Sequence, residues 1–143
     1  MAAEGNSGAI GEAIASRALS QIGVPFRLHG RIPGQALDCV GLAGFAVLGH
    51  CGLAGLPTRY GLRGAFLEWL GPELKQREMK FCELDEKPQV GDLIVFSIAP
   101  RQAHLGVWAA GGCVHAHAGL RRVVLTPAPV PWQVIGRWRF EGG

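Results

Sequence analysis

Apolar residues in the first part of the chain recur at the spacing of an α-helix. The positions that repeat every three or four residues are Ile10, Ile14, Ala18, Leu19 and Ile22. This spacing predicts a helix with one apolar face, because residues three and four apart lie on the same side of a helix. Asn6 or Ser7 is available as its N-terminal cap, and Gly23 stands just past its expected end.

A second helix is predicted after a loop that is rich in proline and glycine and covers residues 24–37. Asp38 can cap a helix that runs from Cys39 to near residue 50, with Gly52 as its stop. The helix sequence CVGLAGFAVLGH is apolar on every side, which predicts that this helix is buried. A third helical stretch is expected near residues 62–70.

The second half of the chain reads as short β-strands. The β-rich runs are LIVFSI after Gly91-Asp92, HLGVWA at 104–109, CVHAHA at 113–118, RVVLT at 122–126 and WQVIGRWRF at 132–140. A turn at Gly111-Gly112 would join the second and third runs as a β-hairpin. Helices followed by consecutive antiparallel strands predict an α+β domain.

Composition indicates one folded domain that spans residues 1–143, about the usual size of a single domain. Apolar residues make up 48% of the chain and charged residues 17%, which excludes intrinsic disorder. The net charge of +3 comes without a basic stripe, so we expect no nucleic-acid partner. No apolar run reaches the roughly 18 residues of a membrane span. The N-terminus lacks the basic region and apolar core of a signal peptide, so synthesis in the cytoplasm is expected.

Cys39 stands out as a candidate nucleophile. A thiol in the first turn of a helix meets free backbone N–H groups and the positive end of the helix dipole, and both favour the reactive thiolate. The same N–H groups can stabilise the oxyanion of a tetrahedral intermediate. The other cysteines, Cys51, Cys82 and Cys113, form no CxxC pair and are expected as structural thiols.

Three histidines of the predicted hairpin are candidates for a base and for the group that orients it. Side chains alternate along a strand, so His104 shares a sheet face with His115 and His117. Nucleophilic cysteine chemistry needs such a base and orienting group within hydrogen-bond reach. His29 and His50 are expected at the surface. A zinc site built from Cys113, His115 and His117 is not favoured, because structural zinc takes four ligands and no partner motif is present.

The chain resembles the NlpC/P60 family of papain-like cysteine peptidases over most of its length. The segments that carry the resemblance, in family order, are Gly23-Val24-Pro25-Phe26-Arg27, Asp38-Cys39-Val40-Gly41, Val90-Gly91-Asp92-Leu93, His104-Leu105-Gly106-Val107 and Val114-His115-Ala116. Each motif alone is short. Their shared order, on the elements predicted above, makes the resemblance specific.

The resemblance implies a papain-like α+β fold with Cys39 as nucleophile, His104 as general base and acid, and His115 as the polar third member. It also implies hydrolysis of amide bonds in bacterial peptidoglycan stem peptides, typically between γ-D-glutamyl and a diamino acid, without metal or organic cofactor. The compact chain looks most like the branch carried by phages and phage-like particles, so a particle or tail protein is an expected partner. Delivery to the cell wall would then depend on that particle or on lysis.

Two departures from the family pattern keep alternatives open. Phe26 stands where family members often carry a tyrosine whose hydroxyl helps near the oxyanion, which keeps a non-catalytic wall-binding or tail module as an alternative. The run from His104 to His115 is one residue shorter than is common, so His117 is an alternative third member. An amidase or acyltransferase on the same scaffold is the other alternative function.

Overall fold

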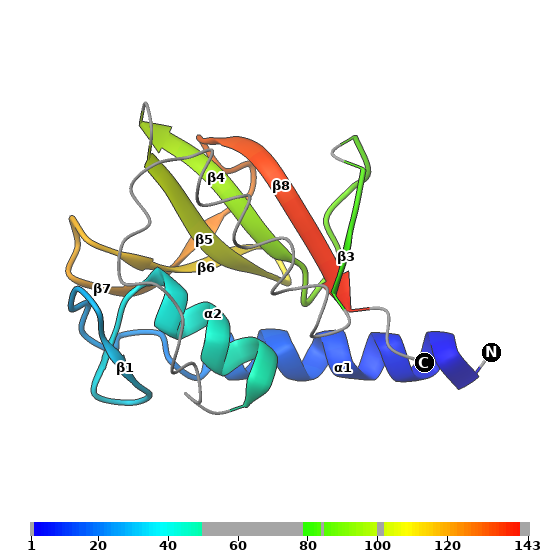
Figure 1. Ribbon diagram of the computed structural model, residues 1–143, viewed down its shortest axis with the longest axis horizontal. Coiled ribbons are helices and arrows are strands. Elements are labelled where there is room, and N and C mark those ends of the chain that lie inside the picture. Colours follow the sequence, from blue (N-terminus) through cyan, green and yellow to red (C-terminus); the bar gives the residue numbers. More distant parts are fainter. Residues whose placement is uncertain (1, 50–78, 84, 100–101, 141–143) are drawn as a thin grey trace.

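The computed structural model describes residues 2–49, 79–83, 85–99 and 102–140, which form two helices and eight strands. In chain order these are α1 (Ala2–Leu19), β1 (Arg31–Ile32), β2 (Ala36–Leu37), α2 (Cys39–Leu48), β3 (Met79–Phe81), β4 (Leu93–Ala99), β5 (Gln102–Ala109), β6 (Gly112–His117), β7 (Arg122–Pro127) and β8 (Gln133–Phe140). Both helices lie along one side of the main sheet (Figure 1). The α+β class predicted from the sequence is confirmed. The predicted helix at 62–70 falls outside the described residues.

Helix α1 is displaced from its predicted bounds toward the N-terminus. It begins at Ala2, so the prediction of Asn6 or Ser7 as its cap is wrong. It also ends at Leu19, before Ile22, because the next residues turn more tightly: the N–H of Gln21 bonds to the carbonyl of Ala18. The N–H of Gly23 then donates to the carbonyl of Val123 on β7. Pairing with the sheet therefore ends the helix one turn earlier than its apolar pattern suggests.

Helix α2 begins at Cys39 as predicted, and most of its residues are buried. Its end differs from the prediction. Gly49, with φ of 79°, is the C-terminal cap, and its N–H bonds to the carbonyl of Phe45 at 2.7 Å. Glycine adopts this left-handed conformation without the steric cost that other residues meet. The predicted stop at Gly52 and the expected surface position of His50 lie outside the described residues.

The main sheet is antiparallel and has the strand order β3-β8-β4-β5-β6-β7. Its last strand in the chain, β8, lies between β3 and β4, so the C-terminal strand is hydrogen-bonded on both sides to strands from the middle of the chain. The predicted runs from residue 93 onward all appear as strands. Three short strands were not predicted: β3, and the pair β1 and β2, which forms a small hairpin inside the segment expected to be loop.

The hairpin of β5 and β6 forms as predicted, with its turn one residue earlier. Ala109 pairs with Gly112, so the turn residues are Ala110 and Gly111 instead of the two glycines. Gly112 belongs to the strand because it also pairs with Pro127 of β7, and a Cβ there would overlap the carbonyl of Thr126. The close approach of β7, which only tertiary structure reveals, accounts for the shift.

Buried apolar residues lie on both faces of the sheet. One face joins the two helices with alternate strand residues, among them Val95, Leu105, Val107 and Val114, in a single core. The other face carries a smaller cluster of Ile94, Phe96 and Cys113, against which Trp108, Val130, Trp132 and Val134 pack. Central strands with buried residues on both faces are held firmly and can position side chains accurately.

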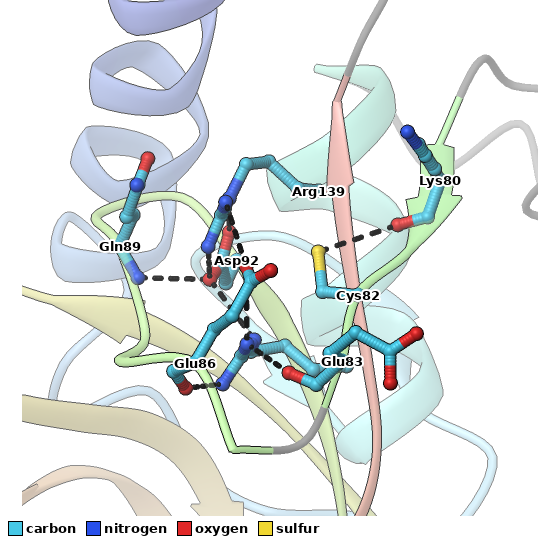
Figure 2. A network of polar contacts seen from close by, with 8 residues as sticks. Lys80, Cys82, Glu83, Glu86, Gln89, Asp92 and Arg139 are labelled. Carbon is cyan, nitrogen blue, oxygen red and sulfur yellow. Dashed lines mark hydrogen bonds and ion pairs between the residues drawn. The ribbon is translucent and has the colours of Figure 1, made fainter.

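A buried carboxylate at the start of β4 ties this strand to β8. Asp92 is fully buried, and both of its oxygens accept from the Arg139 guanidinium, at 2.8 and 2.9 Å. The N–H of Gln89 donates to the same carboxylate at 2.8 Å, as Figure 2 shows. Gly91, just before it, packs directly against Gly11 of α1, so closely that a Cβ would overlap the helix backbone. The Gly-Asp pair singled out in the sequence therefore docks β4 on both β8 and α1.

No helix in the described part of the chain is both long enough and apolar enough to cross a membrane.

Candidate active site

The carboxylate of Asp38 organises the start of the helix that carries Cys39. Asp38 is fully buried, and its Oδ1 accepts from the N–H of Gly41 at 2.7 Å, which confirms it as the N-terminal cap of α2. Its Oδ2 accepts from the N–H of His29 at 3.0 Å and from Arg31 Nη1 at 2.7 Å. Cys39, at 3% exposure, is thus held in the first turn of the helix, beside a carboxylate whose charge is matched by an arginine.

A line of three side chains crosses the neighbouring strands. His104 Nε2, on β5, lies 2.9 Å from His115 Nδ1, on β6. His115 Nε2 lies 2.7 Å from the hydroxyl oxygen of Thr126, on β7. Both distances are those of hydrogen bonds, so they give partners to both nitrogens of His115 and to Nε2 of His104. Helix α2 contacts β5 and β6, the strands that supply the two rings.

The two rings lie on the face of the sheet that carries the smaller apolar cluster. They alternate along β5 and β6 with Leu105 and Val114, which point into the core with the helices. Trp132, from the segment between β7 and β8, packs edge-on against both rings, with centroid distances of 5.1 Å to His115 and 6.4 Å to His104. This indole shields the histidine pair, and their side chains are almost fully buried.

Burial lowers the pKa of both histidines, which favours their neutral forms while Cys39 is a thiol. Desolvation, followed by the charges of His115 and His117, lowers the pKa of His104 from 6.5 to about 3. Desolvation and then the charge of His117 lower the pKa of His115 to about 4. A neutral imidazole has one nitrogen that can accept a proton, which is the form that a general base requires.

The structure distinguishes the two candidates for the third position by their contacts. His115 bonds to His104, whereas His117 Nδ1 accepts from the N–H of Leu120 in the turn that follows β6. His117 lies near the pair, with its ring centroid 5.5 Å from that of His115. His29 is exposed, as expected.

The cysteines predicted as structural thiols are reduced where the structure describes them. Cys82 and Cys113 are buried and free, and burial raises the pKa of Cys113 to about 12, which makes it a poor nucleophile. Cys51 lies outside the described residues. Within the described parts of the chain, no group of three or more histidine, cysteine or acidic side chains could hold a metal ion.

The structure thus joins His104 directly to His115 and places Cys39 on the helix that packs against their strands. Two residues of this site were missed from the sequence. Thr126 and Trp132 reach the histidines from β7 and from the segment after it, and neither belongs to a recognisable motif.

Phe26, at the position where the resemblance predicts a tyrosine, is half-buried at the edge of the main core. Its N–H donates to the carbonyl of Arg121 at 2.9 Å, and it forms a bridge with Leu37, directly before Asp38. The residue therefore supports the segment that leads into α2.

Several solved structures share the fold of this chain at low sequence identity. NlpC1 from Trichomonas vaginalis matches 93% of the chain with a TM-score of 0.66 at 20% identity. An N-acetylmuramoyl-L-alanine amidase from Bacteroides uniformis matches 94% with a TM-score of 0.66 at 13% identity. The peptidoglycan hydrolase RipB from Mycobacterium tuberculosis matches 97% with a TM-score of 0.59 at 21% identity.

The chain covers 45% of the NlpC1 chain, 68% of the RipB chain and 100% of the amidase chain. No family model matches the sequence, and no curated protein matches it. The likeness in structure confirms the predicted fold, which is that of the NlpC/P60 proteins.

Proposed function

From this fold and the hydrogen-bonded histidine pair on the strands that α2 contacts, we propose that the protein is a cysteine hydrolase that cleaves amide bonds in peptidoglycan stem peptides. Cys39 would be the nucleophile, His104 the general base and acid, and His115 the residue that orients His104. The observation that carries the proposal is the hydrogen bond of 2.9 Å between His104 Nε2 and His115 Nδ1. It leaves Nδ1 of His104 as the nitrogen for the thiol, in the arrangement that thiol hydrolases use.

The first half of the reaction forms an acyl-enzyme. Nδ1 of His104 takes the proton of the Cys39 thiol, and the sulfur attacks the amide carbon. The C–N bond then breaks, and the amine leaves with the proton that His104 held. Backbone N–H groups in the first turn of α2 would stabilise the oxyanion, although the N–H of Gly41 is already bound to Asp38.

The second half releases the product. His104 removes a proton from water, the hydroxide attacks the thioester carbon, and the C–S bond breaks. The proton returns to the Cys39 sulfur, so the enzyme ends in its starting state. His115 remains neutral throughout, since its role is to accept the N–H of His104 and to hold that ring.

Digestion of purified peptidoglycan, followed by mass spectrometry of the soluble fragments, tests the proposal. Wild type should release fragments that Cys39→Ala does not release. Cys82→Ala is the matched control, because Cys82 is also buried but lies on the segment after β3, away from the histidines. Circular dichroism should show that both variants fold. Full activity of Cys39→Ala would contradict the proposal.

An amidase is the second candidate, because the match with the amidase from Bacteroides uniformis covers 94% of this chain and all of the amidase chain. Both reactions use the same nucleophile and base, and they differ in the bond that is cut. Fragments that carry a shortened stem peptide would indicate a stem endopeptidase, whereas intact stem peptides freed from the glycan would indicate an amidase.

A wall-binding or tail module without chemistry is the remaining alternative, and Phe26 is the feature that favours it. Alkylation by iodoacetamide near neutral pH separates it from an enzyme. If the protein is a hydrolase, iodoacetamide should alkylate Cys39 faster than Cys82. A Cys39 that does not react would favour the module. Synthesis in the cytoplasm and delivery by a phage-like particle stay predictions of the sequence.

A further inference from the structure

Thr126 closes the line of hydrogen bonds that begins at His104. It faces Cys113 across the β6–β7 pair, and His115 lies two residues further along β6 on the same face. Its hydroxyl oxygen is 2.7 Å from His115 Nε2, the nitrogen that points away from His104. His115 is only 1% exposed, so water does not readily replace this partner.

The direction of each bond follows from counting protons. During the proposed reaction, the His104 ring carries a proton on both nitrogens, so its Nε2–H donates to His115 Nδ1. A neutral His115 must then hold its own proton on Nε2. That N–H points at Thr126, whose hydroxyl oxygen accepts it.

The opposite arrangement does not support the reaction. There, His115 Nδ1–H would donate to His104 Nε2, and the neutral His104 would carry its proton on Nδ1. That nitrogen could not take the thiol proton. The charged form of His104 therefore requires an acceptor at the far end of the line, because a buried N–H without a partner is costly.

We propose that Thr126 is a positioning residue that stabilises the protonated form of His104 through His115 and thereby promotes the thiolate of Cys39. This inference rests on the proposed function, since it assumes that His104 takes the proton of Cys39. Other groups also lie near His115, Thr126 and Cys39. His117 lies beside His115, Cys113 lies opposite Thr126, and Asp38 with Arg31 flanks Cys39.

The test compares Thr126→Val with Thr126→Ser. Valine keeps the shape of threonine but removes the hydroxyl, whereas serine keeps the hydroxyl. The first measurement is the rate of Cys39 alkylation by iodoacetamide as a function of pH, read by mass spectrometry of the peptide that contains Cys39. We expect Thr126→Val to raise the midpoint of this profile by about one pH unit, the effect of leaving one buried N–H without its acceptor. Thr126→Ser should keep the wild-type midpoint.

The second measurement is turnover of peptidoglycan fragments. Thr126→Val should lower kcat roughly tenfold with little change in KM, because the lost bond matters only when His104 is charged. An unchanged alkylation profile and unchanged kcat in Thr126→Val would overturn the inference. Equal losses in Thr126→Ser and Thr126→Val would also overturn it, since they would indicate a packing role.

The two measurements separate this inference from the proposed function. The alkylation profile needs no substrate. A shifted profile in Thr126→Val, in a protein whose wild type cuts no peptidoglycan, would support the role of Thr126 and contradict the peptidase. Cleavage by wild type with no effect of Thr126→Val would support the peptidase and overturn the role of Thr126.

Discussion

Arg31 Nη1 lies 2.7 Å from Oδ2 of Asp38, the buried carboxylate immediately before Cys39. The arginine side chain is 20% exposed, and the aspartate is fully buried. Arg31 therefore balances a negative charge that lies inside the protein, next to a sulfur that must itself become negative. A carboxylate without this partner would oppose formation of the thiolate, since like charges at short range disfavour each other.

The first prediction concerns this pair. Arg31→Met should lower the free energy of unfolding by roughly 2–3 kcal/mol, because it leaves a buried carboxylate without its cation in a partly exposed pair. It should also slow the alkylation of Cys39 at neutral pH. Chemical denaturation and iodoacetamide kinetics measure the two effects.

Arg27→Met is the matched control, since Arg27 is an exposed arginine of the same loop. We expect a change of less than about 0.5 kcal/mol there, as for most surface substitutions. Equal effects of the two variants on Cys39 would show that the pair with Asp38 is not what matters.

The second prediction concerns Gly106, which lies two residues after His104 on the same face of β5. A Cβ at this position would overlap the Sγ of Cys113 and come within 3.3 Å of Phe96. Gly106→Ala should therefore destabilise the protein by about 1–3 kcal/mol, the usual cost of overpacking a tight core.

The clash can be relieved by a second substitution. Cys113→Ala removes the sulfur, so Gly106→Ala should cost less in that background than in wild type. A double-mutant cycle by thermal or chemical unfolding measures the difference. If the cost is the same in both backgrounds, Cys113 is not the residue that requires glycine at position 106.

The hairpin and the buried helix could be predicted from the sequence because their signals are local. The alternation of polar and apolar residues from His104 onward indicates a strand, and the run from Cys39 is apolar on every side. Both signals can be read without the rest of the chain. The end of α1 could not be predicted in this way. It depends on pairing of Gly23 with Val123, one hundred residues later in the chain.

In the candidate site, too, some residues have a local signal in the sequence and others are placed only by long-range pairing. Its histidines lie in motifs that a reader can recognise, and strand alternation places them on one face. Thr126 lies on a short, mostly apolar strand, and only the register of β6 with β7 brings it to His115. Trp132 follows a proline-rich segment whose path over the sheet has no signature in the sequence.

The third prediction concerns stability and pH. The pKa of His104 is lowered to about 3 and that of His115 to about 4, so the unfolded chain binds more protons than the folded protein between about pH 6.5 and pH 3. The stability that the neutral rings contribute is therefore complete above pH 6.5 and declines as the pH falls through this window. The slope for each histidine is at most about 1.4 kcal/mol per pH unit.

Unfolding by urea at a series of pH values measures this slope. His104→Gln with His115→Gln should flatten it, whereas His29→Asn should not, because His29 is exposed. Asparagine is chosen there because it tolerates the left-handed conformation that His29 adopts, with φ of 64°. A slope that persists in the double variant would assign the acid sensitivity to other groups.

The fourth prediction concerns the carboxylate that docks β4. Asp92 faces two arginines: it receives two hydrogen bonds from Arg139, and Arg137 Nε lies 3.5 Å from its Oδ2. The paired carboxylate raises the pKa of Arg139. Asp92→Asn would leave these cations without their buried counter-charge, so we expect a loss of about 3–5 kcal/mol in the free energy of unfolding.

Glu86→Gln is the control for this network. Glu86 also lies near both arginines, at 3.8 Å from Arg139 and 4.0 Å from Arg137, but its side chain is 54% exposed. Exposed ion pairs contribute about 1 kcal/mol or less, so this variant should unfold close to wild type. Because β4 pairs directly with β5, Asp92→Asn should also loosen the strand that carries His104, and hydrogen exchange of the β5 amides would detect it. Unchanged exchange at β5, in a variant destabilised as expected, would show that the network stabilises β8 without supporting the histidine line.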